Sequence, residues 1–240
     1  MTIAGEKSPG STLGPRPGRP WPVALLLAML ILMFVSAPFI ETLERWSQIE
    51  TALVSLVLIS AVAAVGGSKR DTAWAIVLVL PVLASKWIQH IFPDLMSPVI
   101  HSSAGLLFVG WVVMHLFRFI LRAPRVDSEV LCAGIAGYLM LAMLWAVAYT
   151  MVDRLIPGAF NIPAGTAGPK GIQGFTGLYF SVITLATVGY GDITPLAGPA
   201  RMLAMLEAAT GTFYIAIVIS RLVSMYSRQQ AQPPARPGPG

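Results

Sequence analysis

The most informative part of the sequence is Thr184-Leu185-Ala186-Thr187-Val188-Gly189-Tyr190-Gly191-Asp192. It follows an apolar segment, residues 175–187, which as a helix would extend only about 18 Å. A helix needs about 20 apolar residues to cross a hydrocarbon core of about 30 Å, so this segment cannot span a membrane. We therefore predict a re-entrant helix whose non-helical continuation is buried in protein or lines a water-filled cavity.

Six longer apolar stretches flank this segment and are predicted to span the membrane. Their predicted ranges are 23–40, 49–66, 73–92, 99–117, 130–152 and 202–223. Only 11% of the 240 residues are charged and 55% are hydrophobic, whereas soluble domains are about 25% charged. The predicted fold class is therefore an all-α membrane protein with six transmembrane helices and one re-entrant helix, and a soluble globule is excluded.

The first span has an alternative interpretation as a secretory signal peptide. A basic tail precedes it, and Val35-Ser36-Ala37 resembles a cleavage site. Pro38 would then follow the cut, and removal of this span would invert the charge bias of every later loop. We favour a retained span.

Charge placement predicts the orientation, because cytoplasmic loops hold an excess of Lys and Arg. With both termini in the cytoplasm, the cytoplasmic segments contain Lys7, Arg16, Arg19, Lys69, Arg70, Arg118, Arg122, Arg125, Arg221, Arg228 and Arg236. The predicted location is a cell membrane, crossed several times. This orientation accounts for the net charge of +5, so no nucleic-acid partner is needed to explain it. The single Cys132 permits neither an intrachain disulfide nor a cysteine-based metal site.

The pentapeptide Thr187-Val188-Gly189-Tyr190-Gly191 is identical to the selectivity-filter sequence of potassium channels. Over residues 130–226 the chain resembles the pore module of the tetrameric potassium channel family. The resemblance implies an outer helix at 130–152, a turret at 153–174, a pore helix at 175–187, a filter at 187–192 and an inner helix at 201–224. It also implies a homotetramer in the lipid bilayer that transports K⁺, without a cofactor.

The rest of the chain is predicted to form a four-helix transmembrane module at 22–122 and two tails. Residues 1–21 and 227–240 are rich in Gly, Pro, Ser and Gln, so they are predicted to be disordered cytoplasmic tails.

Filter chemistry explains why these residue types occur together. A dehydrated K⁺ needs replacement oxygens, which the carbonyls of residues 187–190 can supply together with the Thr187 hydroxyl. Gly189 and Gly191 can adopt the positive φ that such a backbone requires. We expect Val188 and Tyr190 to point away from the ion path and to pack against the short helix.

Three further side chains are predicted to support the filter. The resemblance places Tyr179 behind the filter, where its hydroxyl can donate to Asp192; alternatively its ring only packs, and Asp192 is a solvated charge at the pore mouth. Glu207 lies inside a span, where an ionisable residue is costly. We expect it to brace the pore helix by hydrogen bonding, the alternative being a solvated position at the outer interface.

The inner helix contains Gly211, which is either a hinge or a site of close helix packing. The resemblance implies that Thr212, Ile215 and Ile219 line the cavity below the filter. Arg221 is expected to extend towards the cytoplasm.

The fourth span lacks the arginine ladder of voltage-gated channels. Arg118, Arg122 and Arg125 cluster at its cytoplasmic end, and 104–117 contains no full charge. A steep voltage sensor needs several charges inside the membrane field, each contributing about 2.3 kcal/mol per 100 mV. Voltage dependence is therefore predicted to be weak or absent.

The sequence thus predicts a passive potassium channel. Two alternatives stay open, a poorly selective cation channel of the same architecture and a secondary transporter with broken helices, although we find no paired repeats of the latter kind. An enzyme is disfavoured because the spans contain no convergent acid, base or metal cluster.

Overall fold

The structure is a computed structural model that describes residues 21–40, 46–66, 69–91, 98–163 and 171–231. Its helices are α1 (Trp21–Ile40), α2 (Trp46–Val65), α3 (Lys69–Ile91), α4 (Pro98–Arg122), α5 (Ser128–Leu155), α6 (Gly174–Leu185) and α7 (Gly198–Ala231). Two short strands, β1 (Phe160–Asn161) and β2 (Thr194–Pro195), pair antiparallel with Phe160 opposite Pro195.

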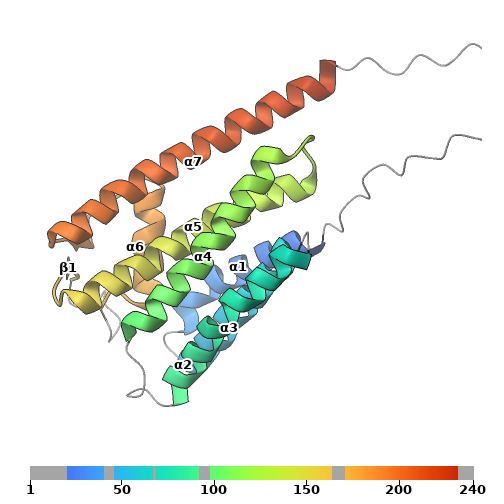
Figure 1. The fold of residues 1–240 in the computed structure, drawn as a ribbon. Helices are drawn as coiled ribbons and strands as arrows, with labels where there is room; N and C mark the ends of the chain where they lie inside the picture. The colour runs from blue at the N-terminus through green and yellow to red at the C-terminus, as the bar shows by residue number, and fades with distance from the viewer. Residues whose placement is uncertain (1–20, 41–45, 67–68, 92–97, 164–170, 232–240) are drawn as a thin grey trace, which may run out of the picture.

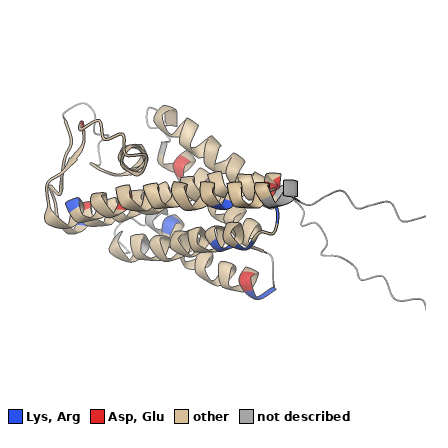
Figure 2. Cartoon of the chain, turned by 90° about the horizontal axis from the view of Figure 1, so that it is seen from above, with Lys and Arg blue, Asp and Glu red and all other residues tan. Residues whose placement is uncertain are grey.

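Every described helix except α6 is long and apolar enough to cross a membrane. The predicted all-α fold with six spanning helices is therefore confirmed. Most of the helical surface is uncharged (Figure 2), as expected for helices whose solvent is lipid. The α6 helix has only 12 residues, which is about 18 Å and too short to cross.

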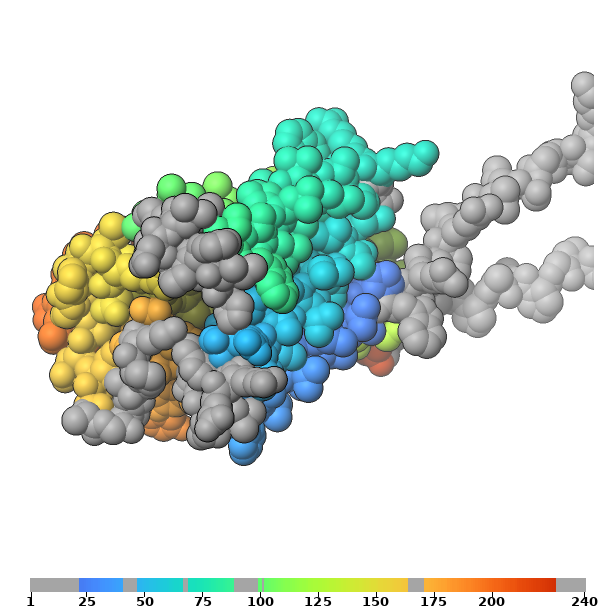
Figure 3. Space-filling model, turned by 90° about the horizontal axis from the view of Figure 1, so that it is seen from below, coloured from blue at the N-terminus to red at the C-terminus, as the bar shows by residue number. Residues whose placement is uncertain are grey.

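The helices are arranged around α4 and α5, which pack along much of their lengths (Figure 1). In Figure 1, α7 lies on one side of this pair and α1–α3 lie on the other, while the short α6 crosses between α7 and α5. Seen from below, the yellow end of α5 lies at one side of the molecule and the blue and cyan helices α1–α3 at the other (Figure 3). The described turn from α4 to α5 is short, and Asp127 caps α5 by accepting a hydrogen bond from the Val130 amide at 2.9 Å.

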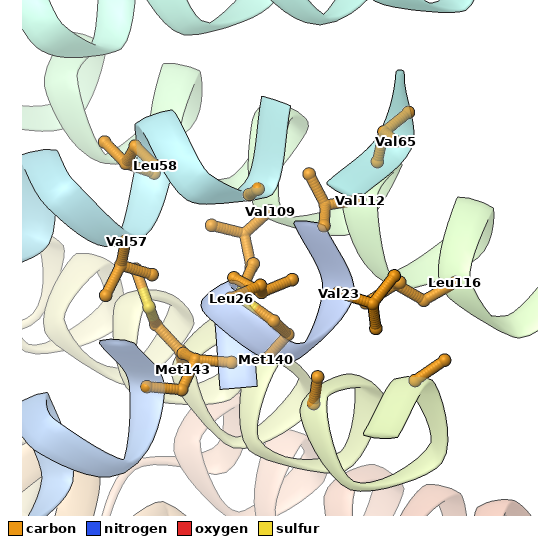
Figure 4. Packing of buried hydrophobic residues seen from close by; sticks show 14 of the residues in the cluster. Val23, Leu26, Val57, Leu58, Val65, Val109, Val112, Leu116, Met140 and Met143 are labelled. Atoms are coloured by element: carbon orange, nitrogen blue, oxygen red, sulfur yellow. The ribbon is translucent and has the colours of Figure 1, made fainter. Parts of the chain in front are cut away.

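The largest apolar core contains side chains of α1–α4 packed against side chains of α5. Side chains from α1, α2, α4 and α5 converge on one another (Figure 4). They include Val23, Leu26, Val57, Leu58, Val109, Val112, Leu116, Met140 and Met143. The four-helix module is therefore packed directly against the outer helix of its own chain.

Several helix ends differ from the predicted ranges, and the differences in α4, α6 and α7 bear on the site. Helix α4 continues beyond residue 117 to Arg122, because long basic side chains can extend to the interface while their backbone stays helical. Helix α6 ends at Leu185 instead of 187, because Thr187 has a positive φ and leaves the helical conformation. Helix α7 runs from Gly198 to Ala231, beyond the predicted 201–224 and into the predicted tail at 227–240.

Other predicted segments lie outside the described residues. These are residues 1–20 of the first tail, 164–170 of the turret and 232–240 of the second tail.

Candidate functional site

The end of α6 turns the chain sharply into the segment 187–191. The amide of Thr187 donates to the carbonyl oxygen of Thr184 at 2.9 Å. The amides of Val188 and Gly189 both donate to the carbonyl oxygen of Ile183, at 2.8 and 3.3 Å. The last turn of α6 therefore anchors the first three residues of the segment through backbone hydrogen bonds, which also satisfies carbonyl oxygens at the helix end.

The segment itself has a left-handed backbone at every second residue. Thr187 has φ 58°, Gly189 has φ 54° and Gly191 has φ 79°. The positive φ expected at both glycines is therefore found. Thr187 was missed, because a β-branched residue rarely adopts this conformation and no sequence pattern signals it. Its positive φ is also the reason that α6 ends at Leu185.

This backbone, with a positive φ at every second residue, differs from that of a regular strand. In a strand, successive carbonyl groups point to opposite sides, because each residue repeats the same extended geometry. A change of handedness at every second residue allows neighbouring carbonyl groups to point to the same side instead. The backbone of 187–191 is thus suited to present a row of oxygens along one edge.

The side chains of the segment are not covered by their own chain. Val188 is 52% exposed and Tyr190 is 71% exposed. The expectation that both pack against the short helix is therefore wrong for a single chain. A packed environment for them would have to come from atoms outside this chain.

Behind the segment, the Tyr179 hydroxyl donates to Asp192 Oδ2 at 2.7 Å. The structure thus contains the predicted Tyr179–Asp192 hydrogen bond, so the ring of Tyr179 does more than pack. This bond raises the pKa of Tyr179 to about 12, with smaller contributions from burial and nearby charge, so the hydroxyl keeps its proton near neutral pH. The other carboxylate oxygen of Asp192 is buried and has no hydrogen-bond partner among the described residues.

Glu207 lies at the junction of three helices and is 0% exposed. The Tyr149 hydroxyl from α5 contacts its Oε2, and Ser181 from α6 contacts its Oε1. The solvated interfacial position considered for Glu207 is therefore excluded. Its contact with Ser181 is the kind of brace on the pore helix that the sequence suggested.

Tyr149 and Ser181 were not singled out from the sequence. A search for polar side chains that face inward from apolar spans would have found them, because such groups need partners inside the bundle.

The buried stripe of α7 carries Glu207, Gly211, Tyr214 and Val218 at helical spacing. A Cβ atom on Gly211 would overlap the carbonyl oxygen of Leu185 at the end of α6. This geometry favours the close-packing interpretation of Gly211 over the hinge. Tyr214 adds a second contact by donating to the carbonyl oxygen of Gly134 in α5 at 2.8 Å.

The predicted cavity residues lie on other sides of α7. Thr212, Ile215 and Ile219 are all exposed in the single chain. The Thr212 hydroxyl donates to the carbonyl oxygen of Ala208 at 3.0 Å, which satisfies it within the helix. The structure therefore does not bring these three residues against the rest of their own chain.

Hydrogen bonds to backbone carbonyl oxygens tie the chain just before the start of α7 and towards its end. Just before α7, the Leu196 amide donates to the carbonyl oxygen of Ala159 at 2.8 Å, next to the β1–β2 pair. At the opposite end of α7, Arg221 donates to the carbonyl oxygen of Ala123 at 3.0 Å. Arg221 is therefore partly buried against the α4–α5 turn. Its expected extension towards the cytoplasm stays a prediction.

No group of three or more His, Cys, Asp or Glu side chains that could hold a metal ion occurs in the part of the chain that the structure describes.

Comparison with protein families identifies the same region. The model of an ion channel family matches residues 130–228. Protein LctB of Bacillus caldotenax is 46% identical over 101 residues, which cover 41% of this chain and 74% of that protein. The inward rectifier potassium channel Kirbac3.1 of Paramagnetospirillum magnetotacticum is 30% identical over 132 residues, covering 53% of this chain and 39% of that protein.

The two pore potassium channel c of Oryza sativa subsp. japonica is 34% identical over 88 residues, covering 37% of this chain and 18% of that protein. The chain thus spans well under half the length of these two potassium channel relatives. No solved structure matches the chain.

Proposed function

We propose that this chain, which belongs to the potassium channel family, is one subunit of a homotetrameric pore that conducts K⁺ passively down its gradient. The observation that carries this proposal is the left-handed backbone at Thr187, Gly189 and Gly191, immediately after a helix too short to cross. Four such segments around one axis would surround an ion with carbonyl oxygens in place of water.

The ion ligands in this proposal are the carbonyl oxygens of Thr187, Val188, Gly189 and Tyr190, with the Thr187 hydroxyl at the inner end. Gly191 supplies the backbone freedom at the outer end. The C-terminus of α6 carries partial negative charge, and α6 ends at the inner end of this segment, so its dipole favours a cation in the cavity.

Several copies are needed because one chain contributes one segment and leaves its side chains uncovered. In the tetramer, Val188 and Tyr190 pack against neighbouring subunits, which keeps the pore diameter fixed. The exposed side chains of Thr212, Ile215 and Ile219 line the cavity below the filter.

Tyr179, Asp192 and Glu207 support the filter from behind through the hydrogen bonds described above. Gly211 acts by close contact with the end of α6.

The channel lies in a cell membrane with both termini in the cytoplasm, and it is weakly or not voltage-gated. The charge distribution supports this orientation, since Arg118 and Arg122 lie in the last turns of α4 and Arg221 lies near the α4–α5 turn, which contains Arg125. Helix α4 carries no Lys or Arg between Pro98 and Phe117, so little charge would move through the membrane field.

The test is electrical. The purified chain is reconstituted in lipid bilayers between opposed K⁺ and Na⁺ gradients, and the reversal potential of the current is measured. We expect a reversal close to the K⁺ equilibrium potential, with unitary currents.

A reversal near zero would instead identify a poorly selective cation channel. Saturable flux coupled to protons without unitary currents would identify a secondary transporter. Crosslinking in detergent that stops at a dimer or trimer would overturn the tetramer.

A further inference from the structure

The hydrogen bonds around Glu207 contain too few protons for an ionised carboxylate. Ser181 Oγ lies 2.7 Å from the carbonyl oxygen of Ala142 and within hydrogen-bond distance of Glu207 Oε1. A serine hydroxyl has one proton to donate, whereas a carbonyl oxygen and an ionised carboxylate can only accept. With Glu207 ionised, one of these two contacts would bring two acceptor oxygens together with no proton between them.

Tyr149 cannot supply the missing proton. Its hydroxyl has a single proton, which is directed to the other carboxylate oxygen, Glu207 Oε2. Two hydroxyl protons therefore face three oxygen–oxygen contacts. One further proton, carried by Glu207 Oε1, completes the set.

With that proton in place, every contact has one donor and one acceptor. Glu207 donates to Ser181, Ser181 donates to the carbonyl oxygen of Ala142, and Tyr149 donates to Glu207. This arrangement leaves no polar atom of the buried group unsatisfied, which a low-dielectric interior strongly favours.

The surroundings of Glu207 also favour a neutral side chain. It is fully buried, and the ion pair found within the described residues joins Lys86 and Glu50 elsewhere. An ionised carboxylate buried without a cation is far more costly than a neutral acid.

We infer that Glu207 is a neutral carboxylic acid and that its proton closes a chain of hydrogen bonds that joins α5, α6 and α7 behind the filter. Ser181 precedes Ile183 by two residues, and Ile183 anchors the amides of Val188 and Gly189. Glu207 is therefore a positioning residue that acts on the filter through α6, a consequence that rests on the proposed function.

The first test reads the proton directly by infrared spectroscopy of the reconstituted full chain. The difference spectrum between wild type and Glu207→Gln should contain the carbonyl stretch of a protonated carboxyl group. The matched control is Glu50→Gln, which removes the partner of Lys86 and should change only bands of ionised carboxylate. Ser181→Ala removes the hydrogen-bond acceptor, so it should shift the protonated band to higher frequency.

The second test uses the shape of the side chain. The amide of Glu207→Gln can donate to Ser181 and accept from Tyr149, so K⁺ flux and thermal stability should stay within about twofold and within a few degrees of wild type. Glu207→Ala leaves both hydroxyls without this partner, and K⁺ flux should fall about tenfold or more.

If the difference spectrum of Glu207→Gln shows only a loss of ionised-carboxylate bands, Glu207 is not a neutral acid and the inference is overturned. The inference is also overturned if Glu207→Gln lowers K⁺ flux and thermal stability as much as Glu207→Ala does. The infrared result holds even if Glu207→Ala fails to fold. If the protein shows the band of a protonated carboxyl group but no K⁺ selectivity, the proposed function is overturned while the inference that Glu207 is protonated stands.

Discussion

The four-helix module, α1–α4, and the pore module, α5–α7, use their polar side chains in different ways. In the first, buried serines donate back to their own helix: Ser55 to Thr51, Ser60 to Val57 and Ser85 to Val82. In the second, Tyr149, Ser181, Tyr179 and Tyr214 reach other elements of the chain. Among the described residues, these three serines thus bond within their own helices, and the Lys86–Glu50 pair at 3.5 Å is a polar contact between two helices of this module.

The pore module is the part of the chain in which the positions of helices relative to one another must be fixed precisely. Apolar packing in lipid permits small shifts of one helix against another, since the contacts are non-directional. Hydrogen bonds between helices fix both distance and register. The pore module has such bonds between α5, α6 and α7, and the segment 187–191 lies between α6 and α7 in the chain. The ion channel family model matches this same region, at 130–228.

The largest effect is expected from Gly189→Asp in the proposed filter. The substitution adds a charge and a side chain at a position with φ 54°, so we expect complete loss of K⁺ current in bilayer recordings. The control is Gly198→Asp at the exposed start of α7, where an acid suits the helix N-terminus and current should persist. Unchanged conduction in Gly189→Asp would refute the filter assignment.

Gly211→Ala compares close packing in the two modules. Its Cβ would overlap the carbonyl oxygen of Leu185, whereas the Cβ of Gly110→Ala in α4 would meet Leu144 at 3.8 Å. We expect Gly211→Ala to lower the free energy of unfolding by about 1–3 kcal/mol and Gly110→Ala to leave it nearly unchanged, as measured by unfolding in detergent. Altered opening with unaltered stability would instead favour a hinge.

Tyr179→Phe removes a single hydrogen bond from the pore module. Asp192 Oδ2 then loses its partner, and Oδ1 has none among the described residues. A bond to a charged group contributes about 1.5–3 kcal/mol, so we expect faster decay of K⁺ current and weaker K⁺ over Na⁺ selectivity. The matched Tyr226→Phe changes an exposed tyrosine, and equal effects of both variants would count against the role of Asp192.

The smallest effect is expected from Arg118→Gln in the four-helix module. Arg118 is exposed near the C-terminal end of α4, which the proposed orientation places outside most of the membrane field. The voltage dependence of the open probability should stay nearly the same in patch recordings. A large loss of gating charge would mean that α4 senses voltage after all and that the two modules are more tightly coupled.

Sequence alone determined the features that depend on local chemistry. The six spans follow from runs of apolar residues, because the bilayer selects for length and composition within each helix. That α6 does not span the membrane follows from its 12 residues, and the positive φ of Gly189 and Gly191 is permitted by the absence of a Cβ atom. Glu207 stood out because an acid inside a span needs a partner.

Only the tertiary structure decided which groups meet. Tyr149 is 58 residues from Glu207 and Ser181 is 26 residues from it, so no local pattern pairs them. The contact of Gly211 with Leu185 likewise depends on how α6 is set against α7. Such choices are made by helix packing, since each partner is one of many polar or small residues until the helices fix its distance.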